Sequence, residues 1–169
     1  MTKRILLVGM MGAGKTTVGQ LTARELGWGY LDSDAEVEAE TGATVPELFA
    51  RDGENAFREA EARALRAACA GASNVVVSVA GGAVLRPENR TLIAASGTVI
   101  WLRAQVDTLA RRVGSGAGRP LLEGDPLTAL ADLEAVRRPL YAEVADLTID
   151  VDGLAPSAVA ARILETVAQ

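Results

Sequence analysis

The sequence predicts a three-layer α/β/α protein, in which a five-stranded parallel sheet is covered by helices on both faces. Short apolar runs of strand length alternate along the chain with segments of helical spacing or helix-forming composition. Near-continuous apolar runs separated by helices are typical of buried parallel strands. In such sheets ligands bind beyond the carboxyl ends of the strands, so the residues that follow each strand are the first candidates for a site.

The expected elements follow one another without an internal repeat or a linker. Strands are predicted at 4–8, 28–31, 75–79, 99–102 and 147–151, and helices at about 16–26, 34–40, 46–70, 87–95, 105–113, 127–144 and 156–168. A length of 169 residues suits a single domain that can bury a substantial core.

The composition narrows the range of partners. A net charge of −5, with no basic tail or stripe, argues against nucleic acid. No apolar run approaches the ~18 residues of a membrane span, so we expect no membrane partner. The single cysteine, Cys69, cannot form an internal disulfide, which suits a reducing cytoplasm, and we expect it to be a buried core residue. The absence of histidine excludes histidine metal sites and Ser–His catalysis.

A phosphate-binding loop follows the first predicted strand. Residues 9–16 read Gly-Met-Met-Gly-Ala-Gly-Lys-Thr, the G-x-x-x-x-G-K-[ST] pattern, in the strand-to-helix setting that this motif requires. The glycines let successive N–H groups surround a phosphate chain, Lys15 can reach the outer phosphates, and the Thr16 hydroxyl can hold Mg²⁺. The helix that follows directs its positive end at the same anion. We therefore predict a binding site for a nucleoside triphosphate.

Two carboxylates, Asp32 and Asp34, follow the second predicted strand. At that edge of the sheet we expect them near the phosphates. One can bind the metal ion through water, and the other can orient or deprotonate an attacking hydroxyl. The alternative is an ordinary helix cap, because an aspartate before a helix accepts hydrogen bonds from backbone N–H groups. The phosphate loop favours the functional interpretation.

Arg58 and Glu61 lie on one helix, the segment predicted at 46–70. Phe57 and Ala60 belong to its apolar stripe, so Glu61 projects beside the core and needs a partner there. An arginine three residues earlier can supply that partner. The pair would hold Arg58 rigidly and leave part of its guanidinium for a ligand carboxylate. The alternative is a surface pair that contributes little to stability.

Two glycine-rich segments also have the composition of a site. Gly81 and Gly82 follow the third predicted strand and permit a close approach of the backbone to a ligand, although a simple turn would use them too. The loop at 114–125 carries one arginine, Arg119, and its glycines give it the freedom to close over a ligand. The alternative for this loop is a plain surface connection.

Arg137 comes two residues before Pro139 in a helical stretch. A proline there removes a backbone hydrogen bond and disturbs the helix, which is unusual for a purely structural segment. The combination indicates a site.

Together these motifs resemble the shikimate kinase family over nearly the whole chain. The matching segments are Gly9–Thr17, Asp32-Ser33-Asp34, Phe57-Arg58-x-x-Glu61, Gly81-Gly82-Ala83, Arg119-Pro120-Leu121-Leu122 and Arg137-x-Pro139-Leu140-Tyr141. The resemblance implies a nucleoside-monophosphate-kinase-like core with strand order 2-3-1-4-5, in a single P-loop kinase domain over residues 1–169. It also implies a substrate-binding segment at about 33–61 and a mobile lid at about 112–124. We expect a monomer.

The implied reaction transfers the γ-phosphoryl group of ATP to the 3-hydroxyl of shikimate, with Mg²⁺ as cofactor, in aromatic amino acid biosynthesis. By resemblance, Asp34, Lys15 and Arg119 are catalytic, and Thr16 and Asp32 serve the metal ion. The residues implied at ATP are Gly12, Ala13, Gly14, Lys15, Thr16, Thr17, Arg111, Arg119, Leu154 and Pro156. Those implied at shikimate are Asp34, Phe49, Phe57, Arg58, Gly81, Gly82 and Arg137, with the two arginines on its carboxylate.

The chain departs from the family pattern at Ala80, where relatives usually have the first of three consecutive glycines. Because the third predicted strand runs directly into Ala80, we expect a negative φ there, which alanine adopts without strain. A second departure is Leu154, which is apolar where relatives can offer a polar or basic side chain to the adenine loop.

Other functions remain open on the sequence alone. A gluconate kinase-like enzyme would also bind a carboxylate with arginines, but this chain has no histidine for the acid–His motif that gluconate kinases resemble. A GTPase-type switch typically carries Asn-Lys-x-Asp, and neither lysine here follows an asparagine. A catalytically silent nucleotide-binding relative is the third alternative, although every expected active residue is present.

Overall fold

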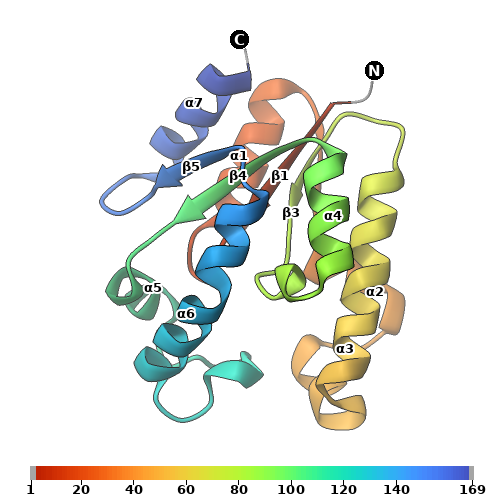
Figure 1. Ribbon diagram of the computed structural model, residues 1–169, viewed down its shortest axis with the longest axis vertical. Helices are drawn as coiled ribbons and strands as arrows, with labels where there is room; N and C mark the ends of the chain where they lie inside the picture. The colour runs from red at the N-terminus through yellow and green to blue at the C-terminus, as the bar shows by residue number, and fades with distance from the viewer. Residues whose placement is uncertain (1–2, 168–169) are drawn as a thin grey trace.

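The computed structural model describes residues 3–167, and within this range five parallel strands form one sheet in the order β2-β3-β1-β4-β5 (Figure 1). The strands are β1 (Arg4–Val8), β2 (Gly29–Asp32), β3 (Val75–Ser78), β4 (Thr98–Arg103) and β5 (Leu147–Asp150). In the centre of the sheet, Leu6 is paired with Val77 on one side and with Val99 on the other. The predicted fold class and strand order are confirmed.

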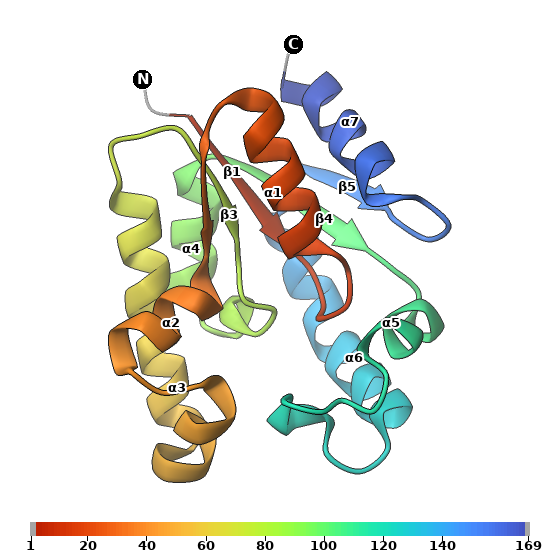
Figure 2. The same cartoon turned by 180° about the vertical axis from the view of Figure 1, so that it is seen from behind.

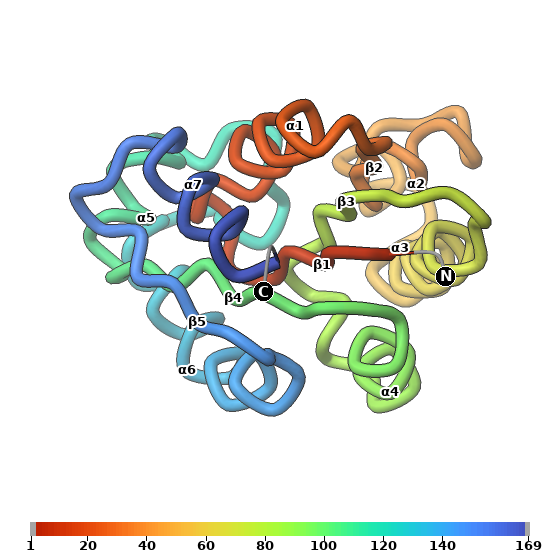
Figure 3. The backbone as a smooth tube through the Cα atoms, turned by 90° about the horizontal axis from the view of Figure 1, so that it is seen from above, coloured from red at the N-terminus to blue at the C-terminus, as the bar shows by residue number. Residues whose placement is uncertain are grey.

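The helices form two layers around the sheet. They are α1 (Lys15–Leu26), α2 (Ser33–Thr41), α3 (Val45–Ala70), α4 (Pro87–Ser96), α5 (Val106–Val113), α6 (Pro126–Val144) and α7 (Pro156–Val167), with short 3₁₀ turns η1 (Ala83–Leu85) and η2 (Pro120–Leu122). Helices α1 and α7 pack side by side on one face (Figure 2), and α3, α4 and α6 lie on the other (Figure 3). Helix α2 packs on α3 and α5 on α6, beyond the carboxyl ends of the strands.

The core is built from the apolar strands that the sequence predicts. Leu6 and Leu7 of β1 have no exposed surface, and the neighbouring strands are similarly buried. A smaller apolar cluster around Phe57 lies where α2 packs on α3. Cys69 is a buried free thiol, as predicted. Within residues 3–167 no helix is long and apolar enough to cross a membrane.

Helix α3 differs from a simple continuous helix. A capping box starts it, because the Thr44 hydroxyl accepts from Glu47 N–H while the Glu47 carboxylate accepts from Thr44 N–H. At Gly53 the backbone leaves the helical region, with φ 83° and ψ 176°, so the helix is kinked. Glycine adopts this conformation without the steric cost of a Cβ atom. The kink divides the first two turns of α3 from the part that carries Arg58.

The prediction that Pro139 disturbs its helix is not borne out: α6 continues through Pro139 to Val144. Pro139 is exposed, and so is Ala135, whose carbonyl loses its helical partner. Water can satisfy that carbonyl on the solvent side, which explains why the helix tolerates the ring. The opposite side of α6 buries Arg137 and Tyr141.

Candidate active site

The loop between β1 and α1 has the conformation that its glycines allow. Gly9, Gly12 and Gly14 all have positive φ, at 146°, 84° and 94°. A Cβ atom on Gly9 would lie 2.5 Å from the carbonyl oxygen of Leu102, so only glycine fits there. Helix α1 begins directly after Gly14, with Lys15 as its first residue. Its free N–H groups therefore face the loop, which suits the binding of a phosphate chain.

The Lys15 side chain folds back over the phosphate loop and is hydrogen-bonded to its backbone. Its ammonium group donates to the carbonyl oxygens of Gly9 at 2.8 Å and Met10 at 3.1 Å. Burial lowers the pKa of Lys15 to about 8, against the opposing attraction of Asp34 and Asp32. The lysine is thus a cation near neutral pH, placed between the loop and the two aspartates.

Asp32 caps helix α2 and also lies beside the phosphate loop. It is therefore a helix cap, as one interpretation of the sequence held, and it is also placed where the functional interpretation requires it. Its Oδ1 accepts from the N–H groups of Asp34 at 3.0 Å and Ala35 at 3.3 Å, which starts α2. Its Oδ2 accepts from the Thr16 hydroxyl at 3.1 Å. These contacts leave Asp32 with one orientation, facing Thr16.

The oxygen atoms of Thr16 and Asp32 fit a magnesium ion. Mg²⁺ is usually bound by one or two protein oxygens together with water and substrate phosphates. Within residues 3–167 there is no cluster of three or more acidic, histidine or cysteine side chains that could hold a metal ion by itself. A hydroxyl and a carboxylate at the mouth of a phosphate loop therefore match the way in which a nucleotide-bound Mg²⁺ is held.

Asp34 lies between the phosphate loop and the α3 arginine. Burial raises its pKa, and the neighbouring charge of Asp32 raises it further, while Lys15 and Arg58 lower it. A carboxylate with a raised pKa is a stronger base than one in open water. The raised pKa of Asp34 is a property that general bases share.

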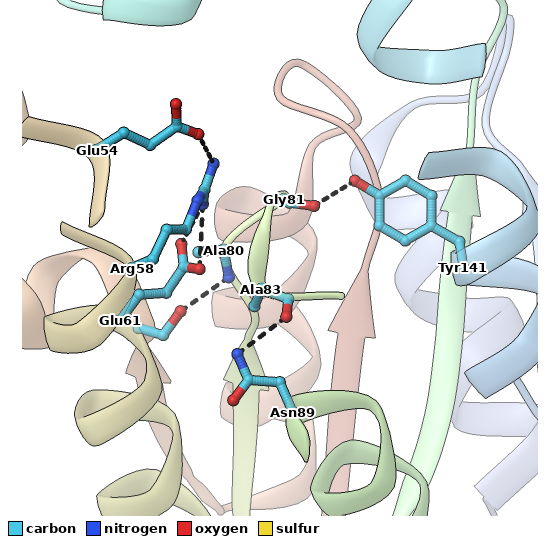
Figure 4. A network of polar contacts seen from close by, with 9 residues as sticks. Glu54, Arg58, Glu61, Ala80, Gly81, Ala83, Asn89 and Tyr141 are labelled. Carbon is cyan, nitrogen blue, oxygen red and sulfur yellow. Dashed lines mark hydrogen bonds and ion pairs between the residues drawn. The ribbon is translucent and has the colours of Figure 1, made fainter. Parts of the chain in front are cut away.

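The predicted ion pair of α3 is present and almost completely buried (Figure 4). Arg58 Nη1 donates to both carboxylate oxygens of Glu61, at 3.1 and 2.9 Å, and Nη2 reaches Glu54 at 3.4 Å. Burial raises the pKa of Glu61 to about 7 although Arg58 opposes the shift. A Cβ atom on Gly82 would overlap the Arg58 guanidinium, which explains the glycine at this position. The close approach predicted for Gly82 is thus made by a side chain of the protein.

Arg137 is the second buried arginine. Its side chain projects from α6 and is 1% exposed, and none of the ion pairs formed within residues 3–167 includes it. The buried Nε has no hydrogen-bond partner. A buried guanidinium without an acidic side chain is costly unless an anionic ligand pairs with it.

The glycine turn after β3 lies against Arg137. A Cβ atom on Gly81 would meet Arg137 Nη1 at 3.2 Å and the Gly9 carbonyl oxygen at 3.3 Å, so Gly81 fits between the arginine and the phosphate loop. Within residues 3–167 no non-glycine residue has positive φ, which confirms the negative φ expected at Ala80. The N–H of Ala80 donates to the Ser33 hydroxyl at 2.8 Å. This bond ties the turn to the start of α2.

One cavity of about 530 Å³ brings these groups together. The sequence-predicted residues that line it are Gly12, Gly14, Lys15, Thr16, Thr17, Asp32, Asp34, Phe49, Phe57, Arg58, Gly81, Gly82, Arg119 and Arg137. Phe49 and Phe57 are in mutual contact, with ring centroids 4.9 Å apart. Ala13 is buried in the phosphate loop. Arg111, Leu154 and Pro156 are not among the lining residues, and their place at adenine stays a prediction.

The sequence analysis missed Arg112, which the structure places on the phosphate loop. Arg112 Nη1 donates to the carbonyl oxygens of Gly12 at 3.1 Å and Ala13 at 3.3 Å, whereas Arg111 donates to the Thr108 hydroxyl at 3.2 Å. Helix spacing does not distinguish them, because each arginine comes three residues after a buried residue of α5, Thr108 or Leu109. The cavity is also lined by Glu38, Val45 and Pro46, which the sequence analysis placed only within the substrate-binding segment at about 33–61.

The glycine-rich loop between α5 and α6 is attached to the core at one point. Leu122, in η2, is 1% exposed, and a Cβ atom on Gly116 would lie 2.8 Å from the Leu122 Cβ. Gly114, Gly116, Gly118 and Gly124 all have positive φ. Arg119 is exposed and lies at the cavity, just before η2. A glycine-rich segment that carries an arginine at the cavity and is attached to the core through Leu122 has the features expected of a lid.

These features define a class of protein. The parallel sheet, the β1–α1 phosphate loop and an arginine-containing cavity next to it are those of a P-loop kinase. A family model for shikimate kinase matches residues 11–168. The chain belongs to the shikimate kinase family.

Individual relatives agree with this membership. The shikimate kinase of Pseudomonas syringae pv. tomato is 42% identical over 168 residues, 99% of this chain and 97% of the relative. That of Symbiobacterium thermophilum is 48% identical over 164 residues, 95% of this chain and 94% of the relative. The solved shikimate kinase from Acinetobacter baumannii in complex with shikimate superposes with a TM-score of 0.95 at 39% identity, over 99% of this chain and 93% of that one.

Proposed function

We propose that this chain is a shikimate kinase, which transfers the γ-phosphoryl group of ATP to the 3-hydroxyl of shikimate and releases ADP and shikimate 3-phosphate. The observation that carries the proposal is that one cavity is lined by the phosphate loop, by Asp34 and by two buried arginines, Arg58 and Arg137. An acceptor that has both a carboxylate and a hydroxyl fits such a cavity. The proposal includes the cytoplasm as its location and a monomeric single domain over residues 1–169 as its working form.

The donor phosphates are proposed to lie in the loop at Gly12–Thr17, with Lys15 on the outer phosphates. The contacts of Lys15 with the loop carbonyls support this role, because they place its ammonium group at the loop. Thr16 and Asp32 would hold Mg²⁺, which offsets negative charge on the β- and γ-phosphates when it is bound. Arg111, Leu154 and Pro156 are proposed at the adenine, and Arg112 beside the loop that it contacts.

Asp34 is proposed as the catalytic base. As the acceptor oxygen forms its bond to the γ-phosphorus, the bond from phosphorus to the bridging oxygen of ADP breaks, and the hydroxyl proton passes to the Asp34 carboxylate. The raised pKa of Asp34 supports this assignment. Arg119, on the lid, is proposed to approach the transferring group from the side opposite to the loop and to share with Lys15 the neutralisation of its charge.

Arg58 and Arg137 are proposed to bind the shikimate carboxylate, with the N–H groups of Gly81 and Gly82 near them. Arg58 already has acidic partners in Glu61 and Glu54, whereas none of the ion pairs formed within residues 3–167 includes Arg137, so Arg137 is the guanidinium available to a ligand carboxylate. Phe49 and Phe57 supply the apolar side of the pocket against the carbon ring.

An ADP-release assay with ATP and Mg²⁺ tests the proposal directly. We expect ADP release with shikimate and none above background with gluconate or with nucleoside monophosphates. The product should carry its phosphate on the 3-hydroxyl, which phosphorus NMR can identify. Turnover with gluconate but not with shikimate would replace the proposal by the gluconate kinase alternative.

A further inference from the structure

Tyr141 is a buried polar side chain that the proposed reaction does not use. It lies on α6 one turn after Arg137 and is 1% exposed. Its ring packs on Trp101, with centroids 5.8 Å apart. Its hydroxyl donates to the carbonyl oxygen of Gly81 at 2.6 Å, across the gap between α6 and the turn after β3 (Figure 4). This is a short hydrogen bond between two distant segments of the chain, from a buried hydroxyl to a carbonyl that is partly buried.

The bond fixes a peptide group in the wall of the cavity. Because a trans peptide is planar, the carbonyl of Gly81 and the N–H of Gly82 point in opposite directions. The carbonyl faces Tyr141, so this N–H points to the side on which Arg58 lies. The overlap that a Gly82 Cβ atom would have with Arg58 agrees with that direction.

Gly81 itself is enclosed on three sides. A Cβ atom there would meet Arg137 Nη1 at 3.2 Å, the Gly9 carbonyl oxygen at 3.3 Å and the Tyr141 hydroxyl at 3.5 Å. The Tyr141 hydroxyl also lies 3.8 Å from the sulfur of Met10. The turn therefore contacts Arg137, Tyr141 and the phosphate loop at the same point. A substitution of Tyr141 can shift the turn and so change its contacts with Arg137 and with the loop.

The hydroxyl is a neutral donor over the working pH range. Burial raises the pKa of Tyr141 to about 12, with Arg137 as the main opposing charge. Because the Tyr141 side chain is buried, its hydroxyl has little access to water as an alternative partner, which strengthens its bond to Gly81 relative to the same bond in open water.

We propose that Tyr141 is a positioning residue for the acceptor carboxylate. Its hydroxyl holds the Gly81–Gly82 peptide against Arg137, so that the backbone N–H groups of the turn and the two guanidiniums meet the carboxylate in a fixed arrangement. This inference rests on the proposed function, since it takes shikimate as the acceptor. Tyr141 itself does not touch the reacting atoms.

The test is to replace Tyr141 by phenylalanine, with Tyr30→Phe as the matched control. These are the two tyrosines of the chain, and each change removes one hydroxyl. The Tyr30 hydroxyl donates to Ser78 at 3.0 Å and to Asp32 Oδ2 at 3.4 Å, so its contacts are on the donor side of the cavity. Titration calorimetry at 10 °C should show that Tyr141→Phe weakens shikimate binding about tenfold, which is the size of one buried hydrogen bond. ADP binding to Tyr141→Phe, and shikimate binding to Tyr30→Phe, should stay within about twofold of the wild type.

A second ligand separates positioning from a general loss of structure. In methyl shikimate the carboxylate is replaced by a neutral ester, so the guanidiniums of Arg58 and Arg137 lose the negative charge with which they would pair. Tyr141→Phe should reduce the preference of the protein for shikimate over its methyl ester. A purely structural defect would weaken both ligands equally and leave the preference unchanged.

The outcomes distinguish this inference from the proposed function. A wild-type protein that does not bind shikimate contradicts the proposed function itself. A wild-type protein that binds shikimate, together with a Tyr141→Phe protein that binds ADP and has an unchanged shikimate affinity, overturns the role of Tyr141.

Should Tyr141→Phe fail to fold, 3-fluorotyrosine can be incorporated into Tyr30→Phe, where Tyr141 is the only tyrosine. The more acidic hydroxyl should then alter shikimate affinity and leave ADP affinity unchanged, and no alteration of shikimate affinity would also overturn the role.

Discussion

The two halves of the cavity are built in different ways. The half proposed for the phosphate donor is centred on one continuous segment, Gly9–Thr16, in which backbone N–H groups and a helix N-terminus supply positive potential. The half proposed for the acceptor combines side chains from α3 and α6 with the turn after β3, and it contains the buried guanidiniums of Arg58 and Arg137. A phosphate chain can thus be bound by a local motif, whereas recognition of a particular acceptor depends on segments that only the fold brings together.

The two halves also control their charge differently. In the donor half, burial lowers the pKa of Lys15 to about 8, so its charge depends on pH. In the acceptor half, burial raises the pKa of Glu61, the partner of Arg58, to about 7, so the charge of this pair also depends on pH. The titrating group is therefore an ammonium in the donor half and a carboxyl in the acceptor half. The predictions below separate the two halves, beginning with the groups between them.

Arg119→Ala should have the largest effect, because it removes a charge proposed to act on the transferring group. We expect kcat to fall by about 10³–10⁵-fold, the range of an arginine that stabilises phosphoryl transfer. The KM values for ATP and shikimate should change much less. Steady-state kinetics with both substrates measures this, and a rise in a KM value with kcat unchanged would make Arg119 a binding residue only.

Asp34→Asn should come next, since it keeps the shape of the side chain and removes the base. The loss expected is about 10²–10⁴-fold in kcat, which is typical of general base catalysis. ADP affinity, measured by calorimetry, should be unaffected. Substantial residual kcat in this variant would show that Asp34 orients the acceptor without taking its proton.

Gly82→Ala should damage the acceptor half alone. The new Cβ atom would overlap Arg58 and push the guanidinium out of place, and a displacement of about 1 Å can cost about 100-fold. We expect the KM for shikimate to rise by about 10–100-fold while the KM for ATP does not change. Gly71→Ala is the matched control, because its φ is −57° and a Cβ atom there would have no neighbour closer than 3.9 Å. Equal kinetics in the two variants would contradict the account of Gly82.

The smallest effect should be the pH dependence of ADP affinity. The pKa of Lys15 is about 8, so its ammonium group is present below that pH and is lost as the pH rises through it. ADP affinity should therefore fall by about tenfold from pH 7 to pH 9. Lys15→Arg keeps its charge over this range and should show a flatter profile. An identical profile in the variant would assign the pH dependence to another group.

Sequence reasoning succeeds here where the signal is local. The phosphate loop is a contiguous motif, and the Arg58–Glu61 pair follows from helical spacing and the need to satisfy a buried carboxylate. The strand order comes from resemblance, since apolar runs do not specify which strands are neighbours.

It fails where the outcome depends on helix phase or on tertiary packing. Arg111 and Arg112 are adjacent, and only the packing of α5 decides which one faces the phosphate loop. The burial of Leu122 in the loop at 114–125 and the bond from Tyr141 to Gly81 both depend on segments that are distant in the sequence. Pro139 misleads for the same reason, because its effect depends on which side of α6 faces water.

A crossed titration tests the central claim most directly. ADP and shikimate are each titrated into Lys15→Met and Arg137→Ala, with the wild type as reference. Each variant should lose about 10–100-fold in affinity for its own ligand, the size of a lost charged hydrogen bond, and keep the affinity for the other within about twofold. Unchanged shikimate affinity in Arg137→Ala would contradict the assignment of the two halves.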